Sequence, residues 1–226
     1  MKIALISDVH ANIVALEAVL GAIDKEGVDW IIHAGDIVGY YPFPNEVIRL
    51  FQQRGVISIR GNHDRAALNI CDSNMNPLAS LASRWTARHL DIVSINYLRS
   101  LRDELHLILD NLKIAVCHGS PFDRDEYVFE RDVDGSLLER AGSDILILGH
   151  THEPYGIEVE SGGFIVNPGS VGQPRDGDER ASWILFTTSS GPSPPKRVEY
   201  DIGRMQRAVL NEGLPSALAE RLAKGE

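Results

Sequence analysis

The segment KIALISDVH, residues 2–10, decides the fold class, because an apolar run from Ile3 to Ile6 leads into the polar residues Asp8 and His10. A short apolar run of this kind is typical of a buried β-strand. Four more such runs occur along the chain, and each is followed closely by Asp, Asn or His. The five runs cover residues 3–6, 30–33, 56–59, 114–117 and 145–148.

Helical patterns separate the early strands. Apolar residues recur at helical spacing over residues 13–23, with Asn12 as the expected N-cap and Gly27 as the stop. A second helical pattern, over residues 47–51, ends near Gly55. Strands that alternate with helices indicate an α/β domain in which some of the strands are parallel.

The rest of the chain predicts a helical insertion followed by more strands. No strand is evident in residues 66–105, where the apolar spacing favours helices that would form a lid over the site. A loop is expected at residues 189–195, and a helical pattern broken at Gly213 and Pro215 ends the chain. No repeat or long linker interrupts it, so we expect residues 1–226 to form a single domain. The later strands are expected at residues 164–167, 182–187 and 197–200.

The composition is that of a globular protein with a sizeable core. Of the 226 residues, 43% are hydrophobic, and the formal net charge is −10 at pH 7. Such a surface repels nucleic-acid backbones and anionic membranes, so non-specific binding to either is not expected. No apolar run approaches the ~20 residues that span a bilayer, and no signal peptide is recognisable. We therefore expect a cytoplasmic protein whose two cysteines, Cys71 and Cys117, stay reduced.

The polar residues that follow the five apolar runs are types that bind divalent metal ions. In open α/β sheets, ligands bind beyond the carboxyl ends of the strands, so these side chains are expected to converge on one pocket. Imidazole, carboxylate and amide oxygen without thiolate suit Mn, Fe, Zn, Co or Ni. A carboxylate could also bridge two ions ~3.5–4 Å apart. The candidate metal ligands are Asp8, His10, Asp36, Asn62, His118, His150 and His152.

Glycines flank most of these candidates, at positions 35, 61, 119 and 149. Glycine allows a strand to turn sharply and another backbone to approach closely. The alternative interpretation is that each block is an ordinary turn with a hydrogen-bonded histidine. For one block the two interpretations are evenly matched, but five blocks in the same relation to a strand favour a metal site. The remaining histidines, His33, His89 and His106, lie outside the blocks and are not expected to be ligands.

The order of the blocks, D-x-H, G-D, G-N-H-D, G-H and G-H-x-H, resembles the calcineurin-like metallophosphoesterases. The resemblance covers about two-thirds of the chain, from residue 3 to about residue 175, and the segment from Asn167 to Ser170 is similar to a compact prokaryotic branch often described as phosphodiesterases. It implies a sandwich of two mixed β-sheets flanked by helices, a four-layer αββα arrangement.

The resemblance also implies a role for each site residue. It assigns His63 to a position near the leaving group, oriented by Asp64, and it makes Asp36 a bridge between two metal ions. One ion would be held by Asp8, His10, Asp36 and His152. The other would be held by Asp36, Asn62, His118 and His150.

The implied function is metal-dependent hydrolysis of a small phosphate ester, most simply by a phosphodiesterase that uses a hydroxide bridging two divalent ions. Mn²⁺ is the first expectation for the metal. A phosphomonoesterase, acting on phosphoproteins or nucleotides, is the alternative, and a non-catalytic scaffold of the same fold is a third. Arg175 is either a phosphate ligand or a surface arginine, and Tyr40 and Tyr41 either line the pocket or pack against the next helix. Nothing in the sequence indicates an oligomeric state.

Overall fold

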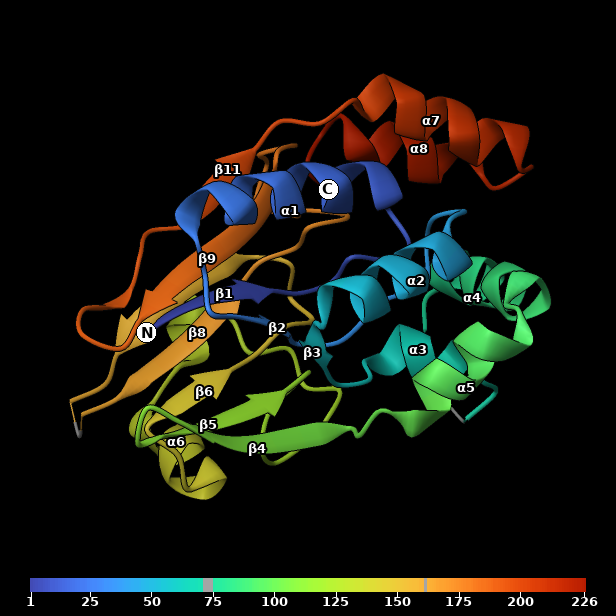
Figure 1. The fold of residues 1–226 in the computed structure, drawn as a ribbon. Helices are drawn as coiled ribbons and strands as arrows, with labels where there is room; N and C mark the ends of the chain where they lie inside the picture. The colour runs from blue at the N-terminus through green and yellow to red at the C-terminus, as the bar shows by residue number, and fades with distance from the viewer. Residues whose placement is uncertain (71–74, 161) are drawn as a thin grey trace.

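Two β-sheets packed face to face form the centre of the molecule, as the computed structural model shows for residues 1–70, 75–160 and 162–226 (Figure 1). The six-stranded sheet has the order β10-β9-β1-β2-β3, with β11 paired to β9, and the five-stranded sheet has the order β4-β5-β6-β8-β7. The first sheet contains β1 (Lys2–Ile6), β2 (Trp30–His33), β3 (Ile57–Ser58), β9 (Ala181–Thr187), β10 (Gly191–Pro192) and β11 (Lys196–Val198). The second contains β4 (Glu104–Leu109), β5 (Leu112–Cys117), β6 (Ile145–Ile147), β7 (Pro154–Glu158) and β8 (Phe164–Pro168).

Both sheets are mixed, and their parallel parts position the site. Strands β1, β2 and β3 run parallel, whereas β9 runs antiparallel to β1. Strands β5, β6 and β8 are likewise parallel, with β4 and β7 antiparallel at the two edges. The parallel strands of each sheet therefore end on the same edge, which is where their following loops carry polar residues.

Alternation along the strands divides the core into layers. Ile3 and Leu5 of β1 pack between the sheets with Ile114 and Val116 of β5. The next residues along β1 face the opposite way, towards helices α1 (Ile13–Glu26) and α2 (Pro44–Arg54). The outer face of the five-stranded sheet is covered by α6 (Gly135–Ala141) (Figure 1). The four-layer αββα sandwich is confirmed.

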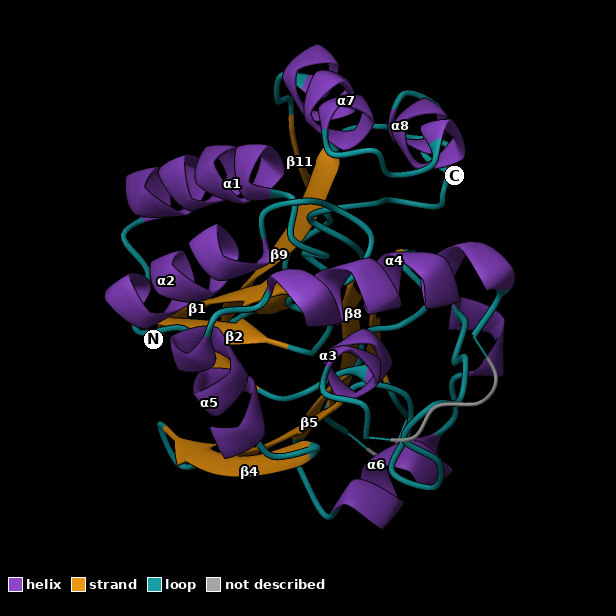
Figure 2. Cartoon of the chain, turned by 90° about the vertical axis from the view of Figure 1, so that its right-hand side faces the viewer, coloured by secondary structure: helices purple, strands orange, loops and turns teal. Residues whose placement is uncertain are grey.

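The predicted helix ends are confirmed at the capping residues. The Asn12 side chain accepts a hydrogen bond from the Ala15 amide at 3.1 Å, and Gly27 ends α1 in the left-handed conformation. Gly55 ends α2 in the same way. The expected break between Gly213 and Pro215 separates α7 (Ile202–Asn211) from α8 (Ser216–Leu222), and this pair lies beside α1 (Figure 2).

Three strands were not predicted. The region without an evident strand ends in β4, which begins at Glu104, and the expected loop at residues 189–195 contains β10. Strand β7 follows the last predicted ligand block directly. The strand expected over residues 56–59 is reduced to the two residues of β3. These strands lie at sheet edges or are very short, so their burial patterns are weak.

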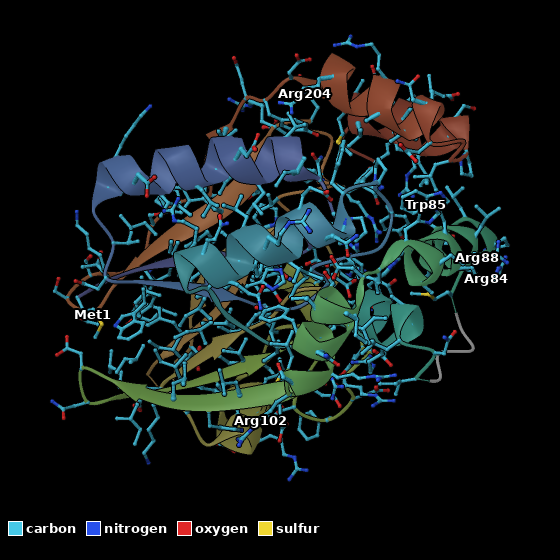
Figure 3. All side chains as sticks on the ribbon, turned by 45° about the vertical axis from the view of Figure 1, so that its right-hand side comes forward. Met1, Arg84, Trp85, Arg88, Arg102 and Arg204 are labelled. Carbon is cyan, nitrogen blue, oxygen red and sulfur yellow. The ribbon has the colours of Figure 1, made fainter. Side chains whose placement is uncertain are left out.

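The predicted helical insertion contains α4 (Pro77–His89) and α5 (Ile92–Ser100), which follow the short helix α3 (Asn62–Ala67). The Thr86 hydroxyl of α4 donates to the Gly39 carbonyl at 2.9 Å, so the insertion is attached to the loop after β2. Arg84 and Arg88 are exposed and point outwards from α4 (Figure 3). Cys71 lies outside the described residues, whereas Cys117 is free and buried. Among the described residues, no helix is long and apolar enough to cross a membrane.

Candidate metal centre

The predicted metal ligands meet in one place at the carboxyl ends of the parallel strands. Asp8 and His10 follow β1, Asp36 follows β2, and Asn62 begins the helix after β3. His118 follows β5, and His150 and His152 follow β6. All except Asn62, which is partly exposed, are buried. Each sheet therefore contributes ligand residues to the same cluster.

The first group of ligand atoms belongs to Asp8, His10 and His152. The two imidazole Nε2 atoms of His10 and His152 lie 3.1 Å apart, and Asp8 Oδ1 lies 3.2 Å from His152 Nε2. Asp8 Oδ1 is also 3.6 Å from His10 Nε2. One donor atom from each of the three residues lies within 4.8 Å of the others, which is the spacing of a metal-ligand set.

The second group is built around Asp36 and His118. Asp36 Oδ2 lies 3.4 Å from His118 Nε2, and that nitrogen is 2.9 Å from Asn62 Oδ1. The His150 ring lies 4.8 Å from the His118 ring, centroid to centroid. Asp36 Oδ2 is also 3.7 Å from His10 Nε2 in the first group. One carboxylate oxygen thus faces both groups.

Backbone carbonyls fix the orientation of two of these imidazoles. His118 Nδ1 donates to the Ala34 carbonyl at 2.8 Å, and His152 Nδ1 donates to the Gln173 carbonyl at 2.5 Å. A proton on Nδ1 leaves the Nε2 lone pair directed into the cluster. Oδ1 of Asp8 and Oδ2 of Asp36 are buried and, within the described part of the chain, have no hydrogen-bond partner. Buried acceptors that converge without donors fit bound cations.

The electrostatics leave most of these groups in the form that binds metal. Burial lowers the pKa of His150 to about 3. Burial and the positive charge of Arg175 lower the pKa of His152 to about 4, so both rings are neutral. Burial would raise the pKa of Asp8, but the neighbouring histidines outweigh it and hold that pKa well below its ordinary value. For His118, burial is outweighed by the charge of Asp36, which raises the pKa to about 9, and a metal ion would displace that proton.

Five of the seven candidate ligand residues occupy the left-handed backbone region. The φ angles are 52° at Asp8, 50° at His10, 62° at Asp36, 69° at His150 and 64° at His152. This region is costly for residues with a Cβ and is concentrated at functional sites.

Close approach, more than sharp turning, explains the flanking glycines. Of the four flanking glycines, only Gly35 has a positive φ, so a left-handed turn explains one of the four. Gly61 is needed for another reason, because a Cβ there would lie 2.1 Å from Asp36 Oδ1.

Asp64 does not orient His63, so that expectation is wrong. Its two oxygens accept hydrogen bonds from backbone amides of residues 36, 37, 38 and 61, at 2.9–3.2 Å. Asp64 therefore holds the turn that carries Asp36. His63 lies beside the cluster instead, with its ring centroid 4.7 Å from that of His10 and 4.5 Å from that of Tyr40. Its Nδ1 is buried and has no hydrogen-bond partner among the described residues.

Arg175 lies at the edge of the cluster and is held by polar groups. Its Nη2 atom donates to the Tyr40 hydroxyl at 3.2 Å and to Gln173 Oε1 at 3.3 Å. No carboxylate in the described ranges lies within ion-pair distance of this guanidinium. Tyr40 is buried against the His10 ring, so it both packs in the core and lines the site. Tyr41 is also buried, and its hydroxyl accepts a hydrogen bond from the Gln173 side-chain amide at 2.8 Å.

Sequence reasoning missed the residues that support the ligands. The Asn167 side chain donates to the Gly149 carbonyl at 2.8 Å, and the Ser170 hydroxyl donates to the Asp8 carbonyl at 2.7 Å. Both belong to a segment whose motif was recognised, but its role was not. Tyr127, whose ring stacks on His150, was also missed, because no motif contains it.

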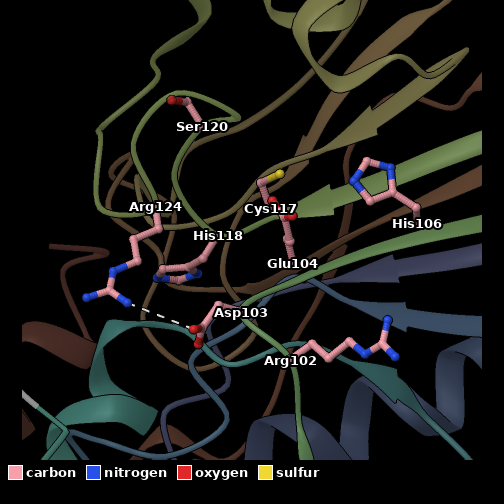
Figure 4. Close-up of a pocket in the computed structure, with 8 residues that line it drawn as sticks. All are labelled: Arg102, Asp103, Glu104, His106, Cys117, His118, Ser120 and Arg124. Atoms are coloured by element: carbon pink, nitrogen blue, oxygen red, sulfur yellow. Dashed lines mark ion pairs between the residues drawn. The ribbon is translucent and has the colours of Figure 1, made fainter.

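A pocket of about 510 Å³, with His118 among its lining residues, opens between β4 and the loop after β5 (Figure 4). Arg124 at its edge lies 3.9 Å from Asp103, so opposite charges face each other there. His106 lines this pocket and is not part of the ligand cluster.

The other two histidines that were not expected to be ligands also lie outside the cluster. His33 is hydrogen-bonded to Ser58, and His89 stacks on Trp85.

Comparison with known proteins agrees with this geometry. Residues 1–191 match the family model of the calcineurin-like phosphoesterase superfamily domain. A metallophosphoesterase structure from Sphaerobacter thermophilus is 39% identical with a TM-score of 0.86, covering 100% of this chain and 99% of that one. An uncharacterised protein of Methanocaldococcus jannaschii is 33% identical over 99% of this chain and 98% of its own length. A phosphodiesterase of the same organism is 26% identical over 75% of this chain and 83% of its own length. The chain therefore belongs to the calcineurin-like phosphoesterase superfamily.

Proposed function

We propose that this protein is a phosphodiesterase that uses two divalent metal ions, with Mn²⁺ as the first candidate and Fe, Zn, Ni or Co as alternatives. The observation that carries the proposal is the placement of Asp36 Oδ2, which faces both groups of ligand atoms. One ion would be held by Asp8, His10, Asp36 and His152. The second would be held by Asp36, Asn62, His118 and His150.

The donor set supports this assignment. It contains two carboxylates, one amide oxygen and four imidazoles, and has no thiolate, which suits first-row divalent ions. Two such ions, when bound, lower the pKa of a coordinated water and neutralise charge on the phosphoryl oxygens. The chain's own contribution is to hold the ligands in place through the carbonyls of Ala34 and Gln173 and through Asp64.

His63 is placed to act on the leaving group. Burial holds its pKa well below the ordinary value, so the ring is neutral before substrate binds. A bound phosphate anion would raise that pKa and favour the protonated ring. The ring would then donate a proton to the departing alkoxide, the task of a general acid.

Arg175 is proposed to contact a phosphoryl oxygen from the side of Tyr40. A guanidinium held by neutral hydroxyl and amide groups keeps its charge available for an anion. A single such cation suits the one negative charge of a diester, whereas a dianionic monoester gains more from several cations. The phosphodiesterase name of one relative supports the same choice. We further propose a small phosphate ester as substrate and action in the cytoplasm.

The experiment compares bis-p-nitrophenyl phosphate with p-nitrophenyl phosphate on protein stripped of metal and reloaded with Mn²⁺. We expect turnover only after reloading, with a higher kcat/KM for the diester. A monoester preference of tenfold or more, about 1.4 kcal/mol in barrier, would make the protein a phosphomonoesterase. Absence of turnover with every metal tried would support a non-catalytic scaffold.

A further inference from the structure

An exposed aromatic side chain lies directly against the ligand cluster. Tyr127 is 51% exposed, and its ring stacks on that of His150 with centroids 3.9 Å apart and planes 27° apart. A large half-exposed ring costs free energy by exposing apolar surface. Contact with a functional site makes this ring a candidate for ligand binding.

Tyr127 belongs to a row of flat side chains that leads away from the cluster. The Phe129 ring is nearly parallel to the Tyr127 ring, with planes 13° apart and centroids 6.2 Å apart. The guanidinium carbon of Arg131 lies 4.6 Å from the Phe129 centroid. Tyr127 and Phe129 are alternate residues of the stretch before the 3-10 helix Glu130–Asp132, and they present their rings on one side, with Arg131 of that helix next to Phe129.

The segment is attached to the body of the protein by the residue between the two rings. Val128 is buried in the outer core, and its carbonyl accepts a hydrogen bond from the Tyr155 hydroxyl at 2.8 Å. The rings are thereby held in place before any ligand arrives, which reduces the entropy lost on binding.

We infer that Tyr127 and Phe129 form a base-binding wall, and that the substrate is a phosphodiester of a nucleoside. This inference rests on the proposed function. The phosphate would lie at the ligand cluster, while the nucleobase stacks on the Tyr127 ring next to His150. Every nucleobase has a flat π face, so such a wall binds bases with little preference among them.

The charges around the wall favour a nucleoside diester with a single phosphate over a nucleic-acid strand. Glu126 and Glu130 flank the rings, and the Arg131 guanidinium is 3.8 Å from Asp132. These carboxylates repel further phosphates, and the chain carries a formal net charge of −10.

The experiment uses two diesters with the same leaving group, thymidine 5′-(p-nitrophenyl phosphate) and ethyl p-nitrophenyl phosphate, on the Mn²⁺-loaded protein. We expect kcat/KM to be about tenfold higher for the thymidine ester, the size of effect that base stacking supplies. Tyr127→Leu keeps an apolar side chain against His150 but removes the π face. It should bring the ratio of kcat/KM for the thymidine ester to kcat/KM for the ethyl ester close to one. Tyr127→Phe should retain the ratio. Phe122→Leu, a change at a ring that is 61% exposed and faces Arg140, is the control and should leave the ratio unchanged.

The outcomes separate this inference from the proposed function. Turnover of neither ester by the wild-type protein would overturn the proposed function itself. Turnover of both esters at similar kcat/KM would overturn the wall and leave the phosphodiesterase standing. If Tyr127→Leu slowed both esters equally, the ring would serve only to position His150, and the base-binding role would be wrong.

Discussion

Asp36 combines two tasks in one side chain. Its Oδ1 atom accepts a hydrogen bond from the His63 amide at 2.8 Å, and its Oδ2 atom faces His10 and His118. Burial would raise the pKa of Asp36, but the surrounding histidines, His118 first, outweigh it and hold that pKa well below its ordinary value. The side chain is therefore a fixed, fully charged acceptor at the point where both ligand groups meet.

Asp36→Asn should weaken metal binding at least tenfold more than His10→Ala does, a difference of about 1.4 kcal/mol. A neutral amide is a poor bridge between two cations, whereas His10 belongs to one group. Titration calorimetry and elemental analysis of the purified variants would measure affinity and metal content. Equal metal content and equal turnover in the two variants would contradict a bridging role for Asp36.

His63→Ala should slow the hydrolysis of an alkyl ester by about 10²–10⁴, the range expected for loss of a general acid. The loss on the nitrophenyl analogue should be under about tenfold, because p-nitrophenolate leaves without a proton. Metal content, measured in parallel, should stay near that of the wild-type protein. A similar loss for both leaving groups would indicate that His63 binds substrate instead.

At the scale of elements, the sequence predicted the parts of the site that depend on side-chain type. The convergence of the candidate ligands after β1, β2, β5 and β6 was predicted because a strand, a loop and a donor residue follow one another in each block. The support of His118 and His152 by the carbonyls of Ala34 and Gln173 could not be predicted, since every residue has a carbonyl. Tertiary geometry alone decides which one lies within reach.

Strands were likewise predicted where side-chain type alone marks them, and missed where it does not. Strand β1 is apolar and buried from Ile3 to Ile6, which makes it easy to recognise. Strand β4 alternates between exposed and partly buried residues at a sheet edge, and its beginning could not be told apart from the helices before it.

The role predicted for Asp64 was wrong because adjacency to His63 in sequence did not place the two side chains together. Residues 62–67 form α3, and the Asp64 carboxylate reaches back to the backbone around Asp36.

Gly61→Ala should disable the metal centre while leaving the fold intact. A Cβ at this position would lie 2.1 Å from Asp36 Oδ1 and 2.5 Å from the Asp36 amide nitrogen, so the turn that carries Asp36 must move. We expect metal affinity to fall at least tenfold and turnover to fall with it.

Gly21→Ala is the matched control for this change. Gly21 lies inside α1, and an added Cβ would meet nothing within 4 Å. The substitution should raise the free energy of unfolding by about 0.5–1 kcal/mol, because alanine favours the helix, without altering metal binding. Normal metal affinity in Gly61→Ala, measured beside this control, would show that Asp36 does not depend on the close approach.

At the scale of the whole molecule, the cluster links the two sheets. Asp8, His10 and Asp36 follow strands of the six-stranded sheet, whereas His118, His150 and His152 follow strands of the five-stranded sheet. Metal ions bound there would connect both halves of the sandwich, and a preformed set of this kind does not exist in the unfolded chain. Metal binding should therefore stabilise the whole fold and not only the site.

Saturating Mn²⁺ should raise the melting temperature of the metal-free protein. A ligand present at 100 times its Kd adds about 2.7 kcal/mol to the free energy of unfolding, which corresponds to about 5–10 °C for a protein of this size. Calorimetry of one sample before chelation, after chelation and after reloading would measure the shift, and turnover should be lost and regained in step. Arg84→Ala, on the exposed face of α4, should show the full shift in melting temperature, whereas Asp36→Asn should lose most of it.

Because the ligands come from both sheets, the native protein should still unfold in one transition, and metal binding should move that whole transition to higher temperature. A shift confined to part of the transition would mean that the ions hold only one half of the sandwich.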